Sequence, residues 1–266
     1  MELQERYGDF AHAGIAVFAI SYDHVRVLAG FAARHDISYP LLSDRGSRVI
    51  RSLGLLNTHL EAQAAFYGKL VRAFQRGVPY PGTFVLDAQG TVVAKHFEQS
   101  YRVRPQAAAL LEEMTHATDA ERGVRARARS DSVAATARLA QATYRPYQRL
   151  VLRLDLDVAP GLHVYGRPVP DSYTPLEVTT DPLGSLEVGA AAWPAPRPFR
   201  ITGLDERFAV HEGTLSASVP LVLTRDVGDV TLVARLRYQA CSARECFPPE
   251  ELRLQVPLTA LGKFDD

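Results

Sequence analysis

The sequence is short of cysteine, lysine and long apolar runs. Its 266 residues contain two cysteines, Cys241 and Cys246, and three lysines. Any thiol chemistry must therefore use this one pair. No apolar run approaches the roughly 18 residues that a membrane-spanning helix requires, and Met1–Arg6 lacks the layout of a secretory signal.

The chain also lacks net charge. Thirty basic residues balance thirty acidic ones, so no long-range field exists to recruit nucleic acid or an anionic membrane. No glycine-rich phosphate loop follows a strand, and no cluster of metal ligands is visible, so we expect no cofactor. The length and an apolar content of 47% are typical of two domains with substantial cores.

The two cysteines lie in a short loop between two predicted strands. Leu232–Gln239 and Leu252–Val256 alternate apolar and polar residues. Paired antiparallel strands bring Cα atoms to about 5.5 Å, which is within the roughly 4.4–6.8 Å that a disulfide spans. We therefore expect that Cys241 and Cys246 can form a disulfide.

Three functions are open to this pair. Closing so small a loop stabilises a domain by only about 2 kcal/mol, whereas exposed small-ring disulfides are the exchange-competent class. This favours redox exchange over a purely structural bond. A zinc site would need two further ligands, and the second half of the chain has only His163 and His211, each of which is expected to be an ordinary strand or loop residue.

The first half of the sequence predicts an α/β fold. An apolar run at Gly14–Ser21 is typical of a buried parallel strand, and Val25–His35 has helical periodicity. The remaining elements expected are strands at Tyr39–Ser43, Thr83–Asp87 and Thr91–Phe97, and helices at Ser47–Leu53, at His59–Phe74 and after Pro105.

The second half predicts an all-β sandwich. Short strands alternate with loops rich in Pro, Gly and Asp, the spacing expected of such a fold. The expected strands are Val133–Leu139, Leu150–Val158, Leu176–Thr180, Leu215–Leu223, Thr231–Gln239 and Leu252–Leu258. The charged segment at 119–129 is expected to be a solvated linker between domains at 1–118 and 130–261.

The first half contains three motifs, at Gly14–Asp23, His35–Asp44 and Pro81–Gly90. Together they resemble the peroxiredoxin/redoxin (AhpC/TSA) branch of the thioredoxin fold. The resemblance implies a thioredoxin-like α/β domain in which Pro81 is the candidate cis proline beside the active-site cysteine.

That cysteine has no counterpart here. In the redoxin family the reactive cysteine opens the first helix, and Glu2–Phe10 resembles the remainder of that helix. We therefore expect the domain to be incomplete at its N-terminus, either as a degenerate scaffold or, preferably, because Met1 is not the true start. Peroxiredoxin-type antioxidant activity would require the missing upstream cysteine.

The second half contains four characteristic segments, at Gly161–Gly166, Trp193–Phe199, Val210–Leu215 and Tyr238–Pro249. Together they resemble the N-terminal domain of the thiol:disulfide interchange protein DsbD. The resemblance implies an immunoglobulin-like sandwich in the periplasm or cell envelope. Its cysteine pair would take electrons from a membrane-embedded thiol reductase and pass them to disulfide-bonded proteins.

The same resemblance assigns roles to individual residues. Cys246 would attack the partner disulfide, and Cys241 would resolve the mixed disulfide. A cap loop at Asp205–Phe208 would shield the pair, with Phe208 as its lid, and Tyr165 and Tyr238 would line the site. The alternative function is a non-catalytic envelope binding module in which the cysteines only fasten a loop.

Overall fold

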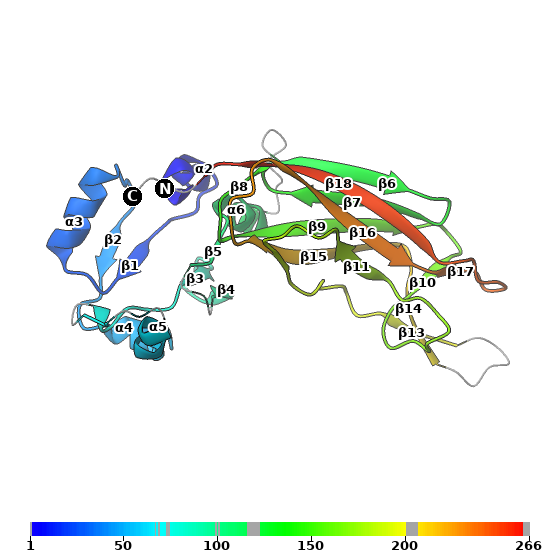
Figure 1. The fold of residues 1–266 in the computed structure, drawn as a ribbon, viewed down its shortest axis with the longest axis horizontal. Coiled ribbons are helices and arrows are strands. Elements are labelled where there is room, and N and C mark those ends of the chain that lie inside the picture. The colour runs from blue at the N-terminus through cyan, green and yellow to red at the C-terminus, as the bar shows by residue number, and fades with distance from the viewer. Residues whose placement is uncertain are drawn as a thin grey trace. The chain divides into compact units, whose positions relative to one another are not determined.

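The structure is a computed structural model that describes residues 2–66, 68, 70–72, 75–98, 100, 102–115, 123–200 and 207–262. The chain divides into two compact units, residues 1–117 and 118–266. The first mixes helices and strands, and the second is built from strands (Figure 1). The predicted fold class, an α/β region followed by an all-β sandwich, is confirmed.

The first unit contains short elements. They are α1 (Glu2–Glu5), α2 (Tyr7–His12), β1 (Ala19–Ser21), α3 (Val25–Arg34), β2 (Leu41–Ser43), α4 (Arg48–Ser52), α5 (Leu60–Phe66), β3 (Gly82–Leu86), β4 (Val92–Phe97), β5 (Arg104–Pro105) and α6 (Ala107–Thr115). β1 pairs in parallel with β2 across α3, and β3 pairs antiparallel with β4. A small core forms around Phe10, Ala107 and Leu110.

Gly14–Ser21 is not the buried strand that its apolar run predicts. Only Ala19–Ser21 is a strand, and Phe18 and Ile20 are 61% and 40% exposed. Within the described residues β1 has a single neighbour, β2. A parallel strand becomes buried only when both faces are covered, which explains the difference. The helix expected at His59–Phe74 is described only as α5.

The second unit consists of three sheets. Its strands are β6 (Val124–Arg129), β7 (Val133–Leu139), β8 (Thr143–Tyr144), β9 (Gln148–Val158), β10 (His163–Tyr165), β11 (Glu177–Thr180), β12 (Leu186–Val188), β13 (Arg197–Arg200), β14 (Arg207–His211), β15 (Thr214–Leu223), β16 (Val230–Tyr238), β17 (Ala240–Cys241) and β18 (Glu250–Ala260). The strand orders are β12-β15-β9-β7-β6, β11-β16-β18-β8 and β13-β14-β10-β17.

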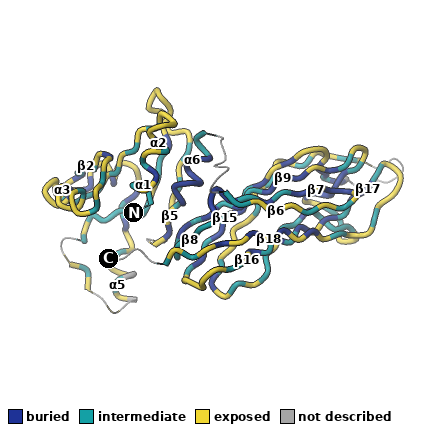
Figure 2. Tube along the Cα trace, turned by 90° about the horizontal axis from the view of Figure 1, so that it is seen from above, coloured by how far each residue is buried: buried dark blue, intermediate teal, exposed yellow. Residues whose placement is uncertain are grey.

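A leucine-rich core fills the sandwich. Along β9 every second side chain, from Leu150 to Leu156, is at most 1% exposed. β15, β16 and β18 show the same alternation, and Figure 2 shows buried segments interrupted by less buried ones along β7 and β9. This period of two is what a strand with one core face requires, and all six predicted strands are present.

The expected linker at 119–129 is partly wrong. Residues 124–129 form β6, which pairs antiparallel with β7 from Val124 opposite Leu139 to Arg129 opposite Ala134. Arg125, Arg127 and Arg129 are exposed, whereas the alanines between them pack against the core. The alternation of arginine and alanine is a strand pattern with a polar outer face, and residues 119–122 lie outside the described part.

The third sheet positions the cysteines. In Figure 1, β13, β14, β10 and β17 gather at one end of the sandwich, where β16 ends and β18 begins. Val164 and Ala240 belong to the main core, while Tyr165 and Cys241 belong to a separate buried cluster. Because successive side chains of a strand point to opposite faces, one face of this sheet closes the sandwich and the other carries the site.

Candidate functional site

The site is built around a disulfide between Cys241 and Cys246, whose Cα atoms lie 4.0 Å apart. The two residues form an antiparallel bridge. The hydrogen bonds on either side run from Ser242 N to Glu245 O (2.8 Å) and from Phe247 N to Ala240 O (2.9 Å). The cysteines are therefore a non-hydrogen-bonded pair, in which Cα atoms lie closer than the 5.5 Å or so expected from the sequence.

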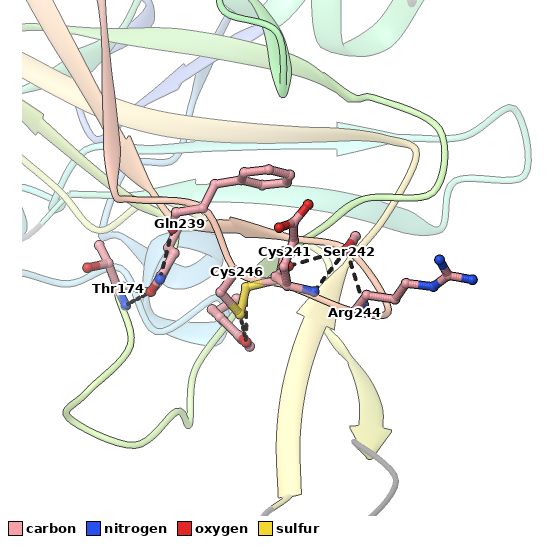
Figure 3. The surroundings of a disulfide bond; sticks show 9 residues. Thr174, Gln239, Cys241, Ser242, Arg244 and Cys246 are labelled. Atoms are coloured by element: carbon pink, nitrogen blue, oxygen red, sulfur yellow. Dashed lines mark hydrogen bonds between the residues drawn. A yellow bond between two sulfur atoms is a disulfide. The ribbon is translucent and has the colours of Figure 1, made fainter.

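The turn between the cysteines is held by Ser242. Its Oγ accepts hydrogen bonds from the backbone N–H groups of Arg244 and Glu245, each at 3.1 Å (Figure 3). This local side-chain capping, common for serine in turns, fixes the four-residue loop without the help of another strand.

Gln239 ties the loop to a neighbouring segment. Its Nε2 donates to the Phe247 carbonyl at 3.0 Å, and its Oε1 accepts from the Thr174 N–H at 3.0 Å (Figure 3). The sequence carries no local signal for this role of Gln239, because Thr174 is distant in sequence and Phe247 lies beyond the loop.

Burial of the two cysteines is unequal. Cys241 is 1% exposed, whereas Cys246 is an exposed residue. A reagent or protein partner therefore reaches the bond from the Cys246 side. Thiol exchange depends on which sulfur is accessible as well as on thiol pKa values, so this asymmetry distinguishes the two cysteines chemically.

Tyr165 is the predicted site residue closest to the sulfurs. Its hydroxyl lies 3.2 Å from Cys241 Sγ and 3.3 Å from Cys246 Sγ. Because a disulfide sulfur carries no proton, the hydroxyl is the donor. Burial, and secondarily the proximity of Tyr173, raises the pKa of Tyr165 to about 12, so the phenol stays protonated at neutral pH.

An aromatic cluster encloses this hydroxyl. Phe208 on β14 is 2% exposed and packs in one cluster with Tyr165, Val210 and Cys241. The Phe208 ring centroid lies 5.5 Å from that of Tyr165 and 5.1 Å from that of Tyr173. The structure thus places Phe208 beside the buried cysteine, on a strand; residues 201–206, which include Asp205, lie outside the described part.

Tyr238 does not join this cluster. It lies in the main core of the sandwich at 0% exposure, and its hydroxyl is 2.8 Å from Ser130 Oγ. It ends β16, two residues before β17 begins. Its expected position lining the cysteines is therefore not what the described contacts show.

Pro81 does not have the cis bond expected of it. Among the described residues the cis peptide bond is Arg167–Pro168, so Tyr80–Pro81 is trans. Trans is the default for an X–Pro bond by about 0.5–1 kcal/mol. The cysteine against which a redoxin proline would lie has no counterpart in residues 1–240.

A shallow polar pocket adjoins the aromatic cluster through Tyr173. Its volume is about 250 Å3, and its charged lining residues are Arg167, Asp171, Glu177 and Arg237. Arg167 and Glu177 pair with each other across it. The pocket therefore offers both signs of charge beside Tyr173, whose ring contacts that of Tyr165.

Within the described residues, no group of three or more His, Cys, Asp or Glu side chains is arranged to hold a metal ion. In the same part of the chain, no helix has the length and apolarity needed to cross a membrane.

Comparison with protein families matches both halves. Residues 1–95 match the AhpC/TSA family, and residues 131–257 match the family described as thiol:disulfide interchange protein DsbD, N-terminal. Proteins provisionally named peroxiredoxins from two Mycobacterium tuberculosis strains are 31% identical over 96 residues, which is 36% of this chain and 55% of theirs. The match thus spans about half the length of these curated relatives.

Solved structures similar to this chain include two bacterial domains and one complex between two domains. The reduced DsbD N-terminal domain of Neisseria meningitidis has 17% identity and a TM-score of 0.30, over 51% of this chain and 85% of that one. The N-terminal periplasmic domain of ScsB from Proteus mirabilis has 19% identity and a TM-score of 0.34, over 48% of this chain and 47% of that one. A complex between the DsbD and PilB N-terminal domains of N. meningitidis has 17% identity and a TM-score of 0.28, over 50% of this chain and 81% of that one.

Proposed function

We propose that this chain, which carries an AhpC/TSA domain over residues 1–95 followed by a DsbD N-terminal-like domain over residues 131–257, transfers electrons by thiol–disulfide exchange through Cys241 and Cys246. The observation that carries the proposal is the disulfide itself, which joins an exposed cysteine to a buried one beneath a tyrosine hydroxyl.

The direction of attack follows from accessibility. In the reduced protein, the Cys246 thiolate attacks a partner disulfide, forming a mixed disulfide and releasing one partner thiolate. Cys241 then attacks Cys246 Sγ, which re-forms the internal bond and releases the second partner thiolate. Two electrons pass to the partner, and a dithiol protein must supply them again for the next cycle.

Tyr165 supports both steps. Its hydroxyl is within hydrogen-bonding distance of each sulfur, so it can donate to whichever sulfur carries negative charge. Hydrogen bonding to the charged form favours that form. The raised pKa of this phenol keeps the proton on oxygen while it does so.

The partners we propose are disulfide-bonded and dithiol proteins, including a membrane-embedded thiol reductase as the electron donor. The match to the DsbD N-terminal family supports this assignment, and with it a periplasmic or envelope location. An oxidising compartment is where a stable cysteine pair persists. The polar pocket at Tyr173 provides adjacent surface for such a partner.

The AhpC/TSA domain has no part in the proposed reaction. Residues 1–240 contain no cysteine, so this part of the chain supplies no thiolate to attack a peroxide.

Serine variants test the proposal. Reduced Cys241→Ser should accumulate a mixed disulfide with a disulfide-bonded test protein, because Cys246 can attack but nothing resolves the adduct. Cys246→Ser should form little adduct, because Cys241 is buried. Both variants should lose net transfer, and non-reducing electrophoresis with a transfer assay measures both outcomes. Arg244→Ala, in the same turn, is the control. Its rate of net transfer should stay within about twofold of wild type, because the substitution leaves both sulfurs in place.

If the chain is instead a binding module with a purely structural disulfide, different results are expected. A reduction potential below about −300 mV, together with serine variants that bind partners normally, would favour the binding module. A potential above about −250 mV agrees with exchange.

A further inference from the structure

His163 lies directly across the sheet from Cys241. In the register of β10 and β17, His163 is paired with Cys241 and Val164 with Ala240. Side chains of directly opposite residues project from the same face, with Cβ atoms about 4.5–5.5 Å apart. The imidazole therefore lies on the same face as Cys241. Tyr165, two residues after His163 in β10, lies on this face as well.

The imidazole is buried and has an unsatisfied nitrogen. His163 is 3% exposed, and its Nε2 has no hydrogen-bond partner among the described residues. Its ring contacts are aromatic: the Phe199 centroid lies at 4.4 Å and the Tyr165 centroid at 5.6 Å. Buried polar atoms are nearly always hydrogen-bonded, so this nitrogen requires an explanation.

The charges around His163 come from one ion pair. Arg197 of β13 and Glu212, which follows β14, pair with each other and both act on the imidazole. Burial lowers the pKa of His163 below its ordinary value, Glu212 opposes this and Arg197 adds to it. Among the described residues, the other titratable groups packed against this face include Tyr165, which stays protonated, and Tyr173, whose ring contacts that of Tyr165. The imidazole is therefore neutral at neutral pH and able to accept a proton.

We propose that His163 is the proton acceptor for Cys241, so that it activates the resolving cysteine of the exchange reaction. The inference rests on the proposed function but concerns a different residue. In the oxidised protein Cys241 Sγ carries no proton, which leaves the imidazole nitrogen unsatisfied; reduction creates the S–H donor that it lacks.

Resolution of the mixed disulfide begins with a proton transfer. In the mixed disulfide between Cys246 and a partner cysteine, the Cys241 thiol transfers its proton to His163. The resulting thiolate attacks Cys246 Sγ, the bond between Cys246 and the partner sulfur breaks, and its electron pair leaves on the partner thiolate. The proton then passes from the imidazolium to that thiolate or to water. A thiolate formed beside His163 raises the affinity of the imidazole for the proton, since opposite charges stabilise one another.

His211 provides a matched control. It is also a histidine buried to 8% exposure in the same sheet, but it pairs with Val164. It therefore lies on the opposite face from His163 and Cys241. Replacing it removes a buried imidazole of the same kind without touching the proposed proton path.

The test uses the full chain with Cys246→Ser, which leaves Cys241 as its single thiol. The ultraviolet absorbance of the thiolate is followed against pH with His163 intact, with His163→Phe and with His211→Phe. We expect the titration midpoint of the Cys241 thiol to rise by about one unit or more in His163→Phe, because the imidazolium formed when His163 takes the thiol proton stabilises the thiolate. His211→Phe should not move it. His163→Gln, polar but unable to take the proton, should behave like His163→Phe.

A second measurement follows turnover. In the chain with both cysteines, His163→Phe should slow release of the mixed disulfide about tenfold at pH 7, the change in thiolate fraction that a one-unit shift produces, while the first attack by Cys246 is unchanged. An unchanged midpoint, or an equal shift with His211→Phe, would overturn the inference. A shifted midpoint in a protein that exchanges no disulfide would instead refute the proposed function and leave the pairing of His163 with Cys241 standing.

Discussion

At the scale of single residues, the disulfide face combines groups whose protonation is governed by burial. Tyr165 and His163 lie on this face of the third sheet, and His211 lies on the other. Burial raises the pKa of Tyr165 and lowers the pKa of both histidines. All three groups are thereby kept neutral near pH 7, which is the state in which one can donate to sulfur and another can accept from it.

The two histidines predict a pH dependence of stability. Each has a native pKa below the ordinary value of 6.5, so on acidification the unfolded chain takes up protons first. The free energy of unfolding of the second unit should therefore be fully retained above pH 6.5 and should fall as the pH drops from there toward the native pKa values. Urea unfolding at pH 7.5 and 5.5 measures the loss.

The variant carrying both His163→Phe and His211→Phe should have a flatter profile over the same interval. Each single variant should remove part of the slope, which covers the case in which the double variant fails to fold. Equal stability of the wild type at the two pH values would contradict the assignment.

At the scale of elements, β6 shows how a charged segment becomes part of a sheet. Its exposed arginines alternate with Ala126 and Ala128, which pack against the core. β6 stands at the end of the order β12-β15-β9-β7-β6. Charged side chains on an edge strand discourage pairing with other chains, so the same pattern gives the strand a core face and a protected outer face.

Substitutions on the two faces of β6 should differ. Ala126→Glu places a carboxylate toward the core and should lower the free energy of unfolding by about 1–3 kcal/mol. Arg127→Glu, one position along on the exposed face, should change it by less than about 0.5 kcal/mol. Chemical denaturation monitored by the single tryptophan, Trp193, compares them. Equal effects would mean that residues 124–129 behave as a linker.

At the scale of the whole molecule, the chain has two units with separate apolar clusters. Phe10, Ala107 and Leu110 centre the first, and the leucines of β9, β15, β16 and β18 fill the second. The disulfide lies within the second unit. Its reduction should therefore act on the stability of that unit.

Reduction should shift one of two thermal transitions. Closing a loop between residues five apart in sequence contributes about 2 kcal/mol by loss of unfolded-chain entropy, so a reductant should lower the transition of the sandwich and leave the other in place. Calorimetry with and without reductant measures this, with the chain carrying serine at both cysteines as the control. A shift of both transitions, or of neither, would contradict the assignment.

Much of this organisation can be predicted from the sequence, because it depends on local patterns. The alternation along Leu150–Val158 specifies a strand with one buried face, and the close spacing of Cys241 and Cys246 between two such strands predicts their bond. Two local patterns predict the wrong structure. The apolar run at Gly14–Ser21 predicts a buried strand, but its burial depends on neighbours to cover it. The charge of residues 124–129 predicts a linker, whereas their period of two is that of a strand.

Only the tertiary structure determined what surrounds the sulfur atoms. Tyr165 and Cys241 are 76 residues apart, yet their side chains lie within hydrogen-bonding distance, and His163 faces Cys241 because of the register between β10 and β17. The unequal burial of the two cysteines likewise depends on which side of the sheet the aromatic cluster covers. A shift of one residue in register would turn these side chains to the opposite face. Sequence can therefore identify the bonded cysteine pair, while strand register determines which side chains surround it.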